Sequence, residues 1–201
     1  MAKTSTSYYS PALRVWHWLN GLVVMGLLGT YFLRETLLSV RFNRQLLVDK
    51  LAENEINADI SVGKDLARAL VDRLWIWHIN LGYALTALFV FRLLIFFLDG
   101  STPVGQALKA WRAGDRHGFL VKSLYAVFYM LVAVMVTSGL AMVFGDSLKI
   151  PQGLGDALTE THEAVMWFFV AFAVVHMAGV IRAELTDDQG LVSRMIHGGK
   201  S

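Results

Sequence analysis

Four long apolar stretches alternate with polar connections along the chain. Each stretch has the roughly 20 residues that a helix needs to cross a bilayer, with few charges in its interior. Because lipid offers the backbone no hydrogen-bond partners, such stretches are expected to be helices. The pattern therefore predicts an all-α integral membrane protein, a four-helix transmembrane bundle that forms a single domain over residues 1–201. The predicted helices cover about residues 12–33, 74–98, 121–144 and 161–181.

The connection between the first two stretches, residues 34–73, is long and has a helical pattern of its own. Residues 37–51 and 62–74 place apolar side chains at helical spacing with charges between them. Asp59 or Ser61 is a candidate N-cap for the second of these segments. Two interpretations stay open: an amphipathic connector on the membrane surface, or a docking surface for an extracytoplasmic partner.

Composition narrows the chemistry that such a bundle can hold. Hydrophobic residues make up 55% of the chain and charged residues 17%, and the mean hydropathy is +0.49, as expected for membrane segments. The chain has no cysteine, which excludes disulfides, thiolate-held metal clusters and covalently attached haem. Any iron must therefore be held by histidine or methionine. The net charge of +2 gives no support for a nucleic-acid partner.

The distribution of basic residues indicates the orientation in the membrane. The connection after the second stretch is rich in lysine and arginine, whereas the connection after the third has only Lys149 among several acidic residues. We therefore expect both termini in the cytoplasm and residues 34–73 outside it. The first stretch has no small-residue cleavage site behind it and is expected to be retained. The basic residues of the two terminal segments include Lys3, Arg14, Arg182 and Lys200.

Four of the six histidines lie in the apolar stretches, where an ionisable side chain is costly and marks a functional site by default. His162 and His176 are fourteen residues apart. This separation gives a rise of about 21 Å and a residual rotation of about 40°, so the two share one helix face at different depths. His17 lies at the cytoplasmic end of the first stretch and His78 at the outer end of the second. The topology therefore predicts two level-matched pairs, His17 with His176 and His78 with His162.

Two histidines that face each other across a bundle are typical of a bis-histidine haem site. The pairs therefore predict two haem b groups, one held by His17/His176 and one by His78/His162. A zinc or copper site would need three or four ligands at one point, whereas each level offers two. Histidines that only hydrogen-bond to a neighbouring helix are the plainer alternative, and the matched levels favour haem over it.

Three glycines lie one turn beyond a histidine, on the same helix face. A glycine there removes the side chain that would strike a porphyrin, so we expect these residues to make room for haem. The alternative is that they only let helices pack closely, as small residues do in membranes. His162 has Met166 at the corresponding position, and Gly139 on the third stretch is a candidate to provide the room instead. The three glycines are Gly21, Gly82 and Gly179.

Arg92 is a further charge at membrane depth. It follows His78 by fourteen residues, which places it near the level of the His17/His176 pair. One interpretation is that Arg92 pairs with a haem propionate, which would offset its burial and raise the reduction potential of that haem. The other is that its side chain extends to the nearby cytoplasmic interface. Both stay open.

Three motifs resemble a known family. The run R-V-W-H-W-L-N-G at residues 14–21 is similar to the first-helix signature of the prokaryotic cytochrome b561 and Ni,Fe-hydrogenase b-type cytochrome superfamily. The spacing of His78 and Arg92 is similar to that of the hydrogenase-type members, and T-H-E…V-H-M around His162 and His176 also matches. The resemblance covers residues 11–182. It implies a four-helix core with two b haems that exchanges electrons with a quinone pool.

These observations predict a membrane-bound di-haem cytochrome b of the bacterial cytoplasmic (inner) membrane. It would transfer electrons between an extracytoplasmic redox partner, a dehydrogenase or hydrogenase-like protein, and quinone, as a subunit rather than an independent enzyme. Residues 34–73 favour a partner, because the superoxide-oxidising members of the superfamily have little between their first two helices. A stand-alone superoxide:quinone oxidoreductase is the alternative, a haem-free membrane anchor is a third hypothesis, and a homodimer is left open.

Overall fold

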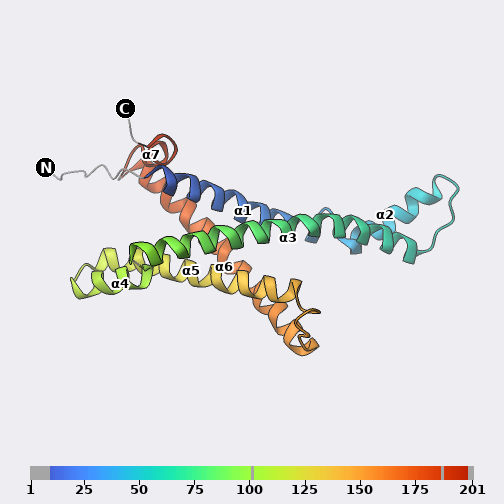
Figure 1. Cartoon of the computed structure of the whole chain (residues 1–201). Coiled ribbons are helices and arrows are strands. Elements are labelled where there is room, and N and C mark those ends of the chain that lie inside the picture. The colour runs from blue at the N-terminus through green and yellow to red at the C-terminus, as the bar shows by residue number, and fades with distance from the viewer. Residues whose placement is uncertain (1–9, 101, 187, 199–201) are drawn as a thin grey trace. The chain divides into compact units, whose positions relative to one another are not determined.

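The computed structural model describes residues 10–100, 102–186 and 188–198, and these residues form helices and connections with no strand (Figure 1). The all-α prediction is confirmed for this part of the chain. Lys3 and Lys200, which contribute to the orientation argument, lie outside the described residues. The helices are α1 (Pro11–Glu35), α2 (Val40–Ala52), α3 (Ile60–Asp99), α4 (Pro103–Arg112), α5 (Arg116–Val143), α6 (Gln152–Leu185) and α7 (Leu191–His197).

Three helices, α3, α5 and α6, are long and apolar enough to cross a membrane. A fourth candidate is α1 with α2, a pair that is bent by 56° at the break between its helices. The prediction of apolar membrane-spanning helices is thus confirmed for three spans, or four if the bent pair forms one.

Two predicted helix starts were wrong. The helix expected from residue 74 begins at Ile60, and the helix expected from residue 161 begins at Gln152. Charged turns end an apolar stretch, but they do not end a helix. With 40 residues, α3 is about 60 Å long, roughly twice the hydrocarbon thickness of a bilayer, so its first turns extend beyond the apolar span.

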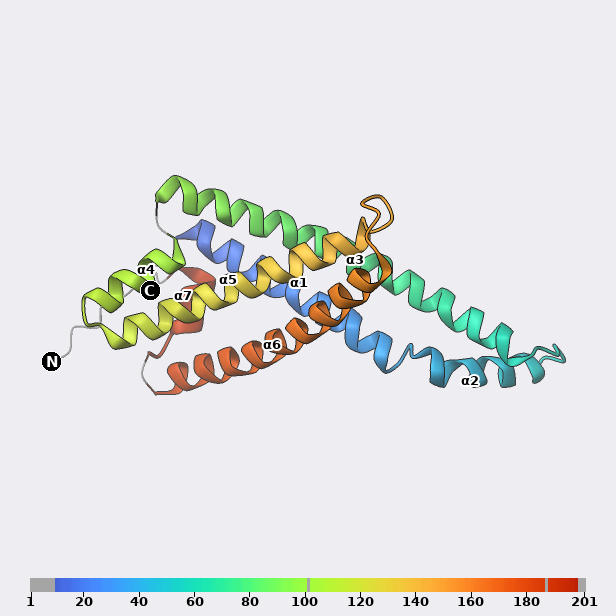
Figure 2. The ribbon, with the colours of Figure 1, turned by 90° about the horizontal axis from the view of Figure 1, so that it is seen from below.

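The chain divides into two compact units, Met1–Gly21 with Thr86–Ser201 and Leu22–Leu85. In the first unit, α4 packs on α5, α7 packs on α6, and α5 and α6 run side by side (Figure 2). Phe128 of α5 contacts α6, with its ring centroid 5.7 Å from that of Phe169 and 4.9 Å from that of Phe172. A single domain over the whole chain stays a prediction.

The second unit contains a helical hairpin made of α2 and the first turns of α3. A Cβ atom on Gly63 would lie 2.2 Å from the carbonyl oxygen of Arg44, so this close approach requires glycine. Asp59 caps α3, because its carboxylate accepts a hydrogen bond from the Ser61 backbone N–H at 2.7 Å. The Ser61 hydroxyl and N–H hold the pKa of Asp59 below its usual value. The helical segments expected within residues 34–73 are therefore present, while their location outside the cytoplasm stays a prediction.

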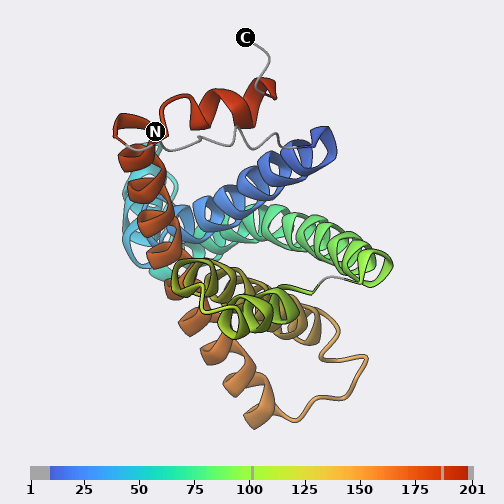
Figure 3. The same ribbon diagram turned by 90° about the vertical axis from the view of Figure 1, so that its left-hand side faces the viewer.

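The basic connection after α3 contains α4, which the hydrophobic pattern did not predict. Thr102 caps this helix by accepting a hydrogen bond from the Gly105 N–H at 3.1 Å, and Pro103 stands in its first turn. Ala107 and Ala110 are buried where α4 packs beside α5 (Figure 3). The connection between α3 and α5 therefore contains a helix that packs on α5.

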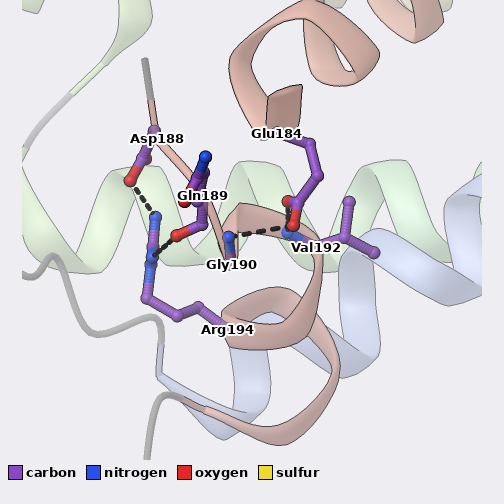
Figure 4. A network of polar contacts seen from close by, with 6 residues as sticks. All are labelled: Glu184, Asp188, Gln189, Gly190, Val192 and Arg194. Atoms are coloured by element: carbon purple, nitrogen blue, oxygen red, sulfur yellow. Dashed lines mark hydrogen bonds and ion pairs between the residues drawn. The ribbon is translucent and has the colours of Figure 1, made fainter. Parts of the chain in front are cut away.

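The segment after α6 folds back on that helix and ends in α7 (Figure 4). The Glu184 carboxylate accepts hydrogen bonds from the N–H groups of Gly190 at 2.9 Å and Val192 at 3.0 Å. Arg194 pairs with Asp188 and also donates to a backbone carbonyl of the turn. These contacts join the start of α7 to the last turn of α6.

Candidate functional site

His17 of α1 and His176 of α6 lie together in the first unit. Their ring centroids are 6.2 Å apart and the ring planes are tilted by 56°. When two imidazoles bind the same metal ion from opposite sides through bonds of about 2 Å, their ring centres are roughly 6 Å apart. The distance between His17 and His176 is therefore suited to two ligands of one iron. Among the described residues, no group of three or more His, Cys, Asp or Glu side chains is arranged to hold a metal ion.

The surroundings of this pair are aromatic. Trp18 meets the ring of His17 edge-on at 5.5 Å, and the ring of Phe172 lies parallel to His176 at 5.8 Å. The buried Nδ1 atom of His17 makes no hydrogen bond within the described part of the chain. Buried polar atoms are normally paired, and an unmet one is more typical of a functional site than of a packed core.

The C-terminal helix α7 touches the helix turn that carries His17. Arg14 donates a hydrogen bond to the carbonyl oxygen of Ile196 at 2.8 Å, and the Trp18 indole donates to that of Met195 at 3.2 Å. Sequence reasoning missed this contact. The sequence feature that could have indicated α7 is the helical spacing of the apolar residues in 191–196, a pattern not expected in a polar tail.

The three predicted glycines lie in open surroundings. A Cβ atom on Gly21, Gly82 or Gly179 would meet no heavy atom of the described residues within 4 Å, apart from nearby residues of its own helix. Close helix packing looks different in this chain, since a Cβ atom on Gly26 would lie 2.9 Å from Leu81. The open space is what a flat cofactor beside a histidine would need.

Arg92 is held over aromatic rings in the first unit. Its guanidinium carbon lies 5.2 Å from the ring centroid of Trp16 and 4.6 Å from that of Phe96. Its Nε donates a hydrogen bond to the hydroxyl oxygen of Tyr129 at 3.2 Å. Because Trp16 directly precedes His17, Arg92 lies near the level of the His17/His176 pair. Sequence reasoning missed Tyr129; the feature that could have indicated it is a tyrosine hydroxyl within an apolar stretch.

The other two histidines belong to different units and are described separately. In the second unit, the Nδ1 atom of His78 lies 2.7 Å from the hydroxyl oxygen of Thr30, and its ring stacks on Trp75 at 4.5 Å. In the first unit, the Nδ1 atom of His162 lies 2.8 Å from the hydroxyl oxygen of Ser138. The pairing of His78 with His162 stays a prediction.

Gly139 makes room for the His162 ring itself. A Cβ atom on Gly139 would lie 3.3 Å from the Cε1 atom of His162, which is tighter than ordinary contact. Sequence reasoning selected Gly139 but missed Thr30 and Ser138. The sequence feature that could have indicated Thr30 and Ser138 is a hydroxyl side chain within an apolar helix. Their contacts with histidines are visible only in the fold.

Apolar spanning helices and two histidines spaced for one iron are the features that a membrane cytochrome of the b type needs. Residues 8–198 match the family described as "Prokaryotic cytochrome b561", and the chain belongs to this family. The family implies haem b in a bacterial membrane protein.

One relative gives a more specific comparison. The chain is 25% identical over 228 residues to the "Probable Ni/Fe-hydrogenase B-type cytochrome subunit" of Rhodobacter capsulatus. The match covers 99% of this chain and 82% of that relative. No solved structure matches the chain.

Proposed function

We propose that the chain is a di-haem cytochrome b that transfers electrons between an extracytoplasmic redox protein and the membrane quinone pool. The observation that carries the proposal is the opposition of His17 and His176, whose ring centroids are 6.2 Å apart on two different helices. Bound haem supplies reversible one-electron transfer at its iron. The chain's own residues would hold the haem, orient it and exclude water from it.

His17 and His176 would hold one haem b, and His78 and His162 would hold the other. The second pair is supported by the sequence pattern, in which each histidine stands near the start of its predicted apolar stretch, and by the hydroxyl that each ring nitrogen meets in its own unit. The glycines one turn from the ligands would leave space for the porphyrin. These glycines are Gly21, Gly82 and Gly179.

The redox partner is proposed to dock on the hairpin of α2 and the first turns of α3. The name of the Rhodobacter capsulatus relative supports a hydrogenase-like partner. The hairpin also exposes large apolar side chains, among them Phe42 at 70% and Leu46 at 53%. We place this hairpin outside the cytoplasm and both termini inside it, in the bacterial cytoplasmic membrane, because of the basic connection between α3 and α5.

The proposal is tested with the detergent-purified chain by counting haem per polypeptide and following its reduction by a short-chain quinol without oxygen. We expect two b-type haems per chain and reduction by quinol. A colourless chain, or haems that quinol does not reduce, would contradict the proposal. Rapid superoxide oxidation by the isolated chain would instead favour the stand-alone oxidoreductase.

Arg92 provides a prediction about the haem held by His17 and His176. Replacing Arg92 by glutamine is expected to lower the reduction potential of that haem, because a positive charge nearby favours the reduced iron. The expected effect is roughly 1 to 2 kcal/mol, the interaction energy of two unit charges about 10 to 15 Å apart in a medium of effective dielectric about 20. A potentiometric titration of both haems measures it, with Arg68→Gln on an exposed turn of α3 as the control. Equal shifts in the two variants would show that Arg92 acts only through the net charge.

A further inference from the structure

Two hydroxyl side chains lie against histidines, Thr30 against His78 of α3 and Ser138 against His162 of α6. The Thr30 hydroxyl oxygen is 2.7 Å from the Nδ1 atom of His78, and the Ser138 hydroxyl oxygen is 2.8 Å from the Nδ1 atom of His162. Thr30 is only 7% exposed and Ser138 only 3% exposed. Each contact lies within one unit, so the same arrangement occurs twice on unrelated helices.

The neighbouring backbone carbonyls indicate which group donates in each of these contacts. The Thr30 hydroxyl is 2.7 Å from the carbonyl oxygen of Leu27, and the Ser138 hydroxyl is 2.6 Å from that of Val134. A carbonyl oxygen cannot donate, so each hydroxyl must donate its single proton to its own helix. The hydroxyl oxygen then accepts from the histidine, which places the ring proton on Nδ1.

A neutral imidazole with its proton on Nδ1 has its lone pair on Nε2. This is the tautomer that binds a metal through Nε2, with the other ring nitrogen held by a hydrogen bond. The ring orientations are also restricted, since His78 stacks on Trp75 and His162 lies against Gly139. The contacts therefore prepare both rings in advance to act as ligands.

The His17 site lacks this arrangement. The buried Nδ1 atom of His17 has no hydrogen-bond partner in the described residues, and Arg92 stands near that level. A hydrogen bond at Nδ1 makes the ring more basic, which favours the oxidised iron and lowers the reduction potential. A nearby positive charge has the opposite effect.

We propose that Thr30 and Ser138 are positioning residues that fix the tautomer of His78 and His162, strengthen haem binding there and lower that haem's reduction potential below that of the His17/His176 haem. This inference rests on the proposed function, because it assumes that the histidines bind haem. On this inference the His17/His176 haem has the higher reduction potential of the two, so an electron shared between them resides mainly on that haem.

The test compares Thr30→Val and Ser138→Ala with two control variants in the full-length, haem-loaded protein. The controls are Thr36→Val and Thr137→Val, because these hydroxyls also donate to a backbone carbonyl, at 2.6 Å and 2.8 Å. Both residues are exposed; Thr36 directly follows α1 and Thr137 lies on α5. The readouts are the rate of haem transfer to apomyoglobin and the potential of each haem. Thr30→Ser and Ser138→Thr, which keep the hydroxyl, serve as rescue variants.

We expect Thr30→Val and Ser138→Ala each to release one haem about 10- to 100-fold faster, because removing such supporting groups from metal ligands lowers metal affinity by about that factor. The potential of that haem should rise, while the other haem, the controls and the rescue variants should match the wild type. Unchanged release and potential in both variants would overturn the inference. A wild-type chain that lacks the second haem would instead overturn the proposed function, so the two failures are distinguishable.

Discussion

Replacing His176 by alanine is expected to remove one b-type haem from the chain, and replacing His78 by alanine to remove the other. Each change deletes one of two side chains that would bind the same iron. His17 and His176 lie with their ring centroids 6.2 Å apart, so loss of either should empty the same site. The haem count per polypeptide and the reduced-minus-oxidised spectrum measure the loss.

A double variant makes this prediction sharper. Because His17 and His176 would act as one unit, His17→Ala with His176→Ala should lose no more haem than either single change. His17→Ala with His78→Ala should lose both haems. His197→Ala is the control, because His197 is exposed at the end of α7. A double variant of His17 and His176 that loses both haems would contradict the predicted pairs, provided circular dichroism shows the helices intact.

The second large effect is expected at the glycines beside the first site. Gly21→Leu and Gly179→Leu should each prevent haem from binding between His17 and His176, because the new side chain would occupy the space beside a ligand. The protein alone offers no obstacle, since a Cβ atom at either position would meet no described heavy atom within 4 Å, nearby residues of its own helix aside. Leucine also favours a helix over glycine by about 0.8 kcal/mol, so the empty protein should not be destabilised.

Gly29→Leu is the matched control for these variants. A Cβ atom on Gly29 also has no described neighbour within 4 Å, outside the nearby residues of α1. Gly29 follows His17 by twelve residues, which turns it about 120° away on the helix and places it about 18 Å further along. It should therefore keep the His17/His176 haem. Full haem content in Gly21→Leu and Gly179→Leu would instead indicate that these glycines face lipid.

Hydropathy and helix periodicity predicted the spanning helices and the residues that the proposed function uses. Hydropathy identified the apolar parts of α3, α5 and α6, because lipid selects apolar side chains whatever the neighbouring helix is. Helix geometry is periodic, so the fourteen residues from His162 to His176 fixed their common face and their separation in depth. The Asp59 cap could also be predicted, because a cap is local to its own turn.

The contacts that these residues make come from the packing of the helices and were not predicted. The start of α3 at Ile60 could not be read from hydropathy, because charged turns stay helical outside the apolar span. The approach of Arg92 to Tyr129 and of Ser138 to His162 joins residues 37 and 24 positions apart, and α7 reaches Arg14 across 182. Such contacts depend on how helices pack, and a periodic pattern within one helix contains no information about its neighbour's face. The sequence therefore predicted the candidate ligands, while packing determined which residues they contact.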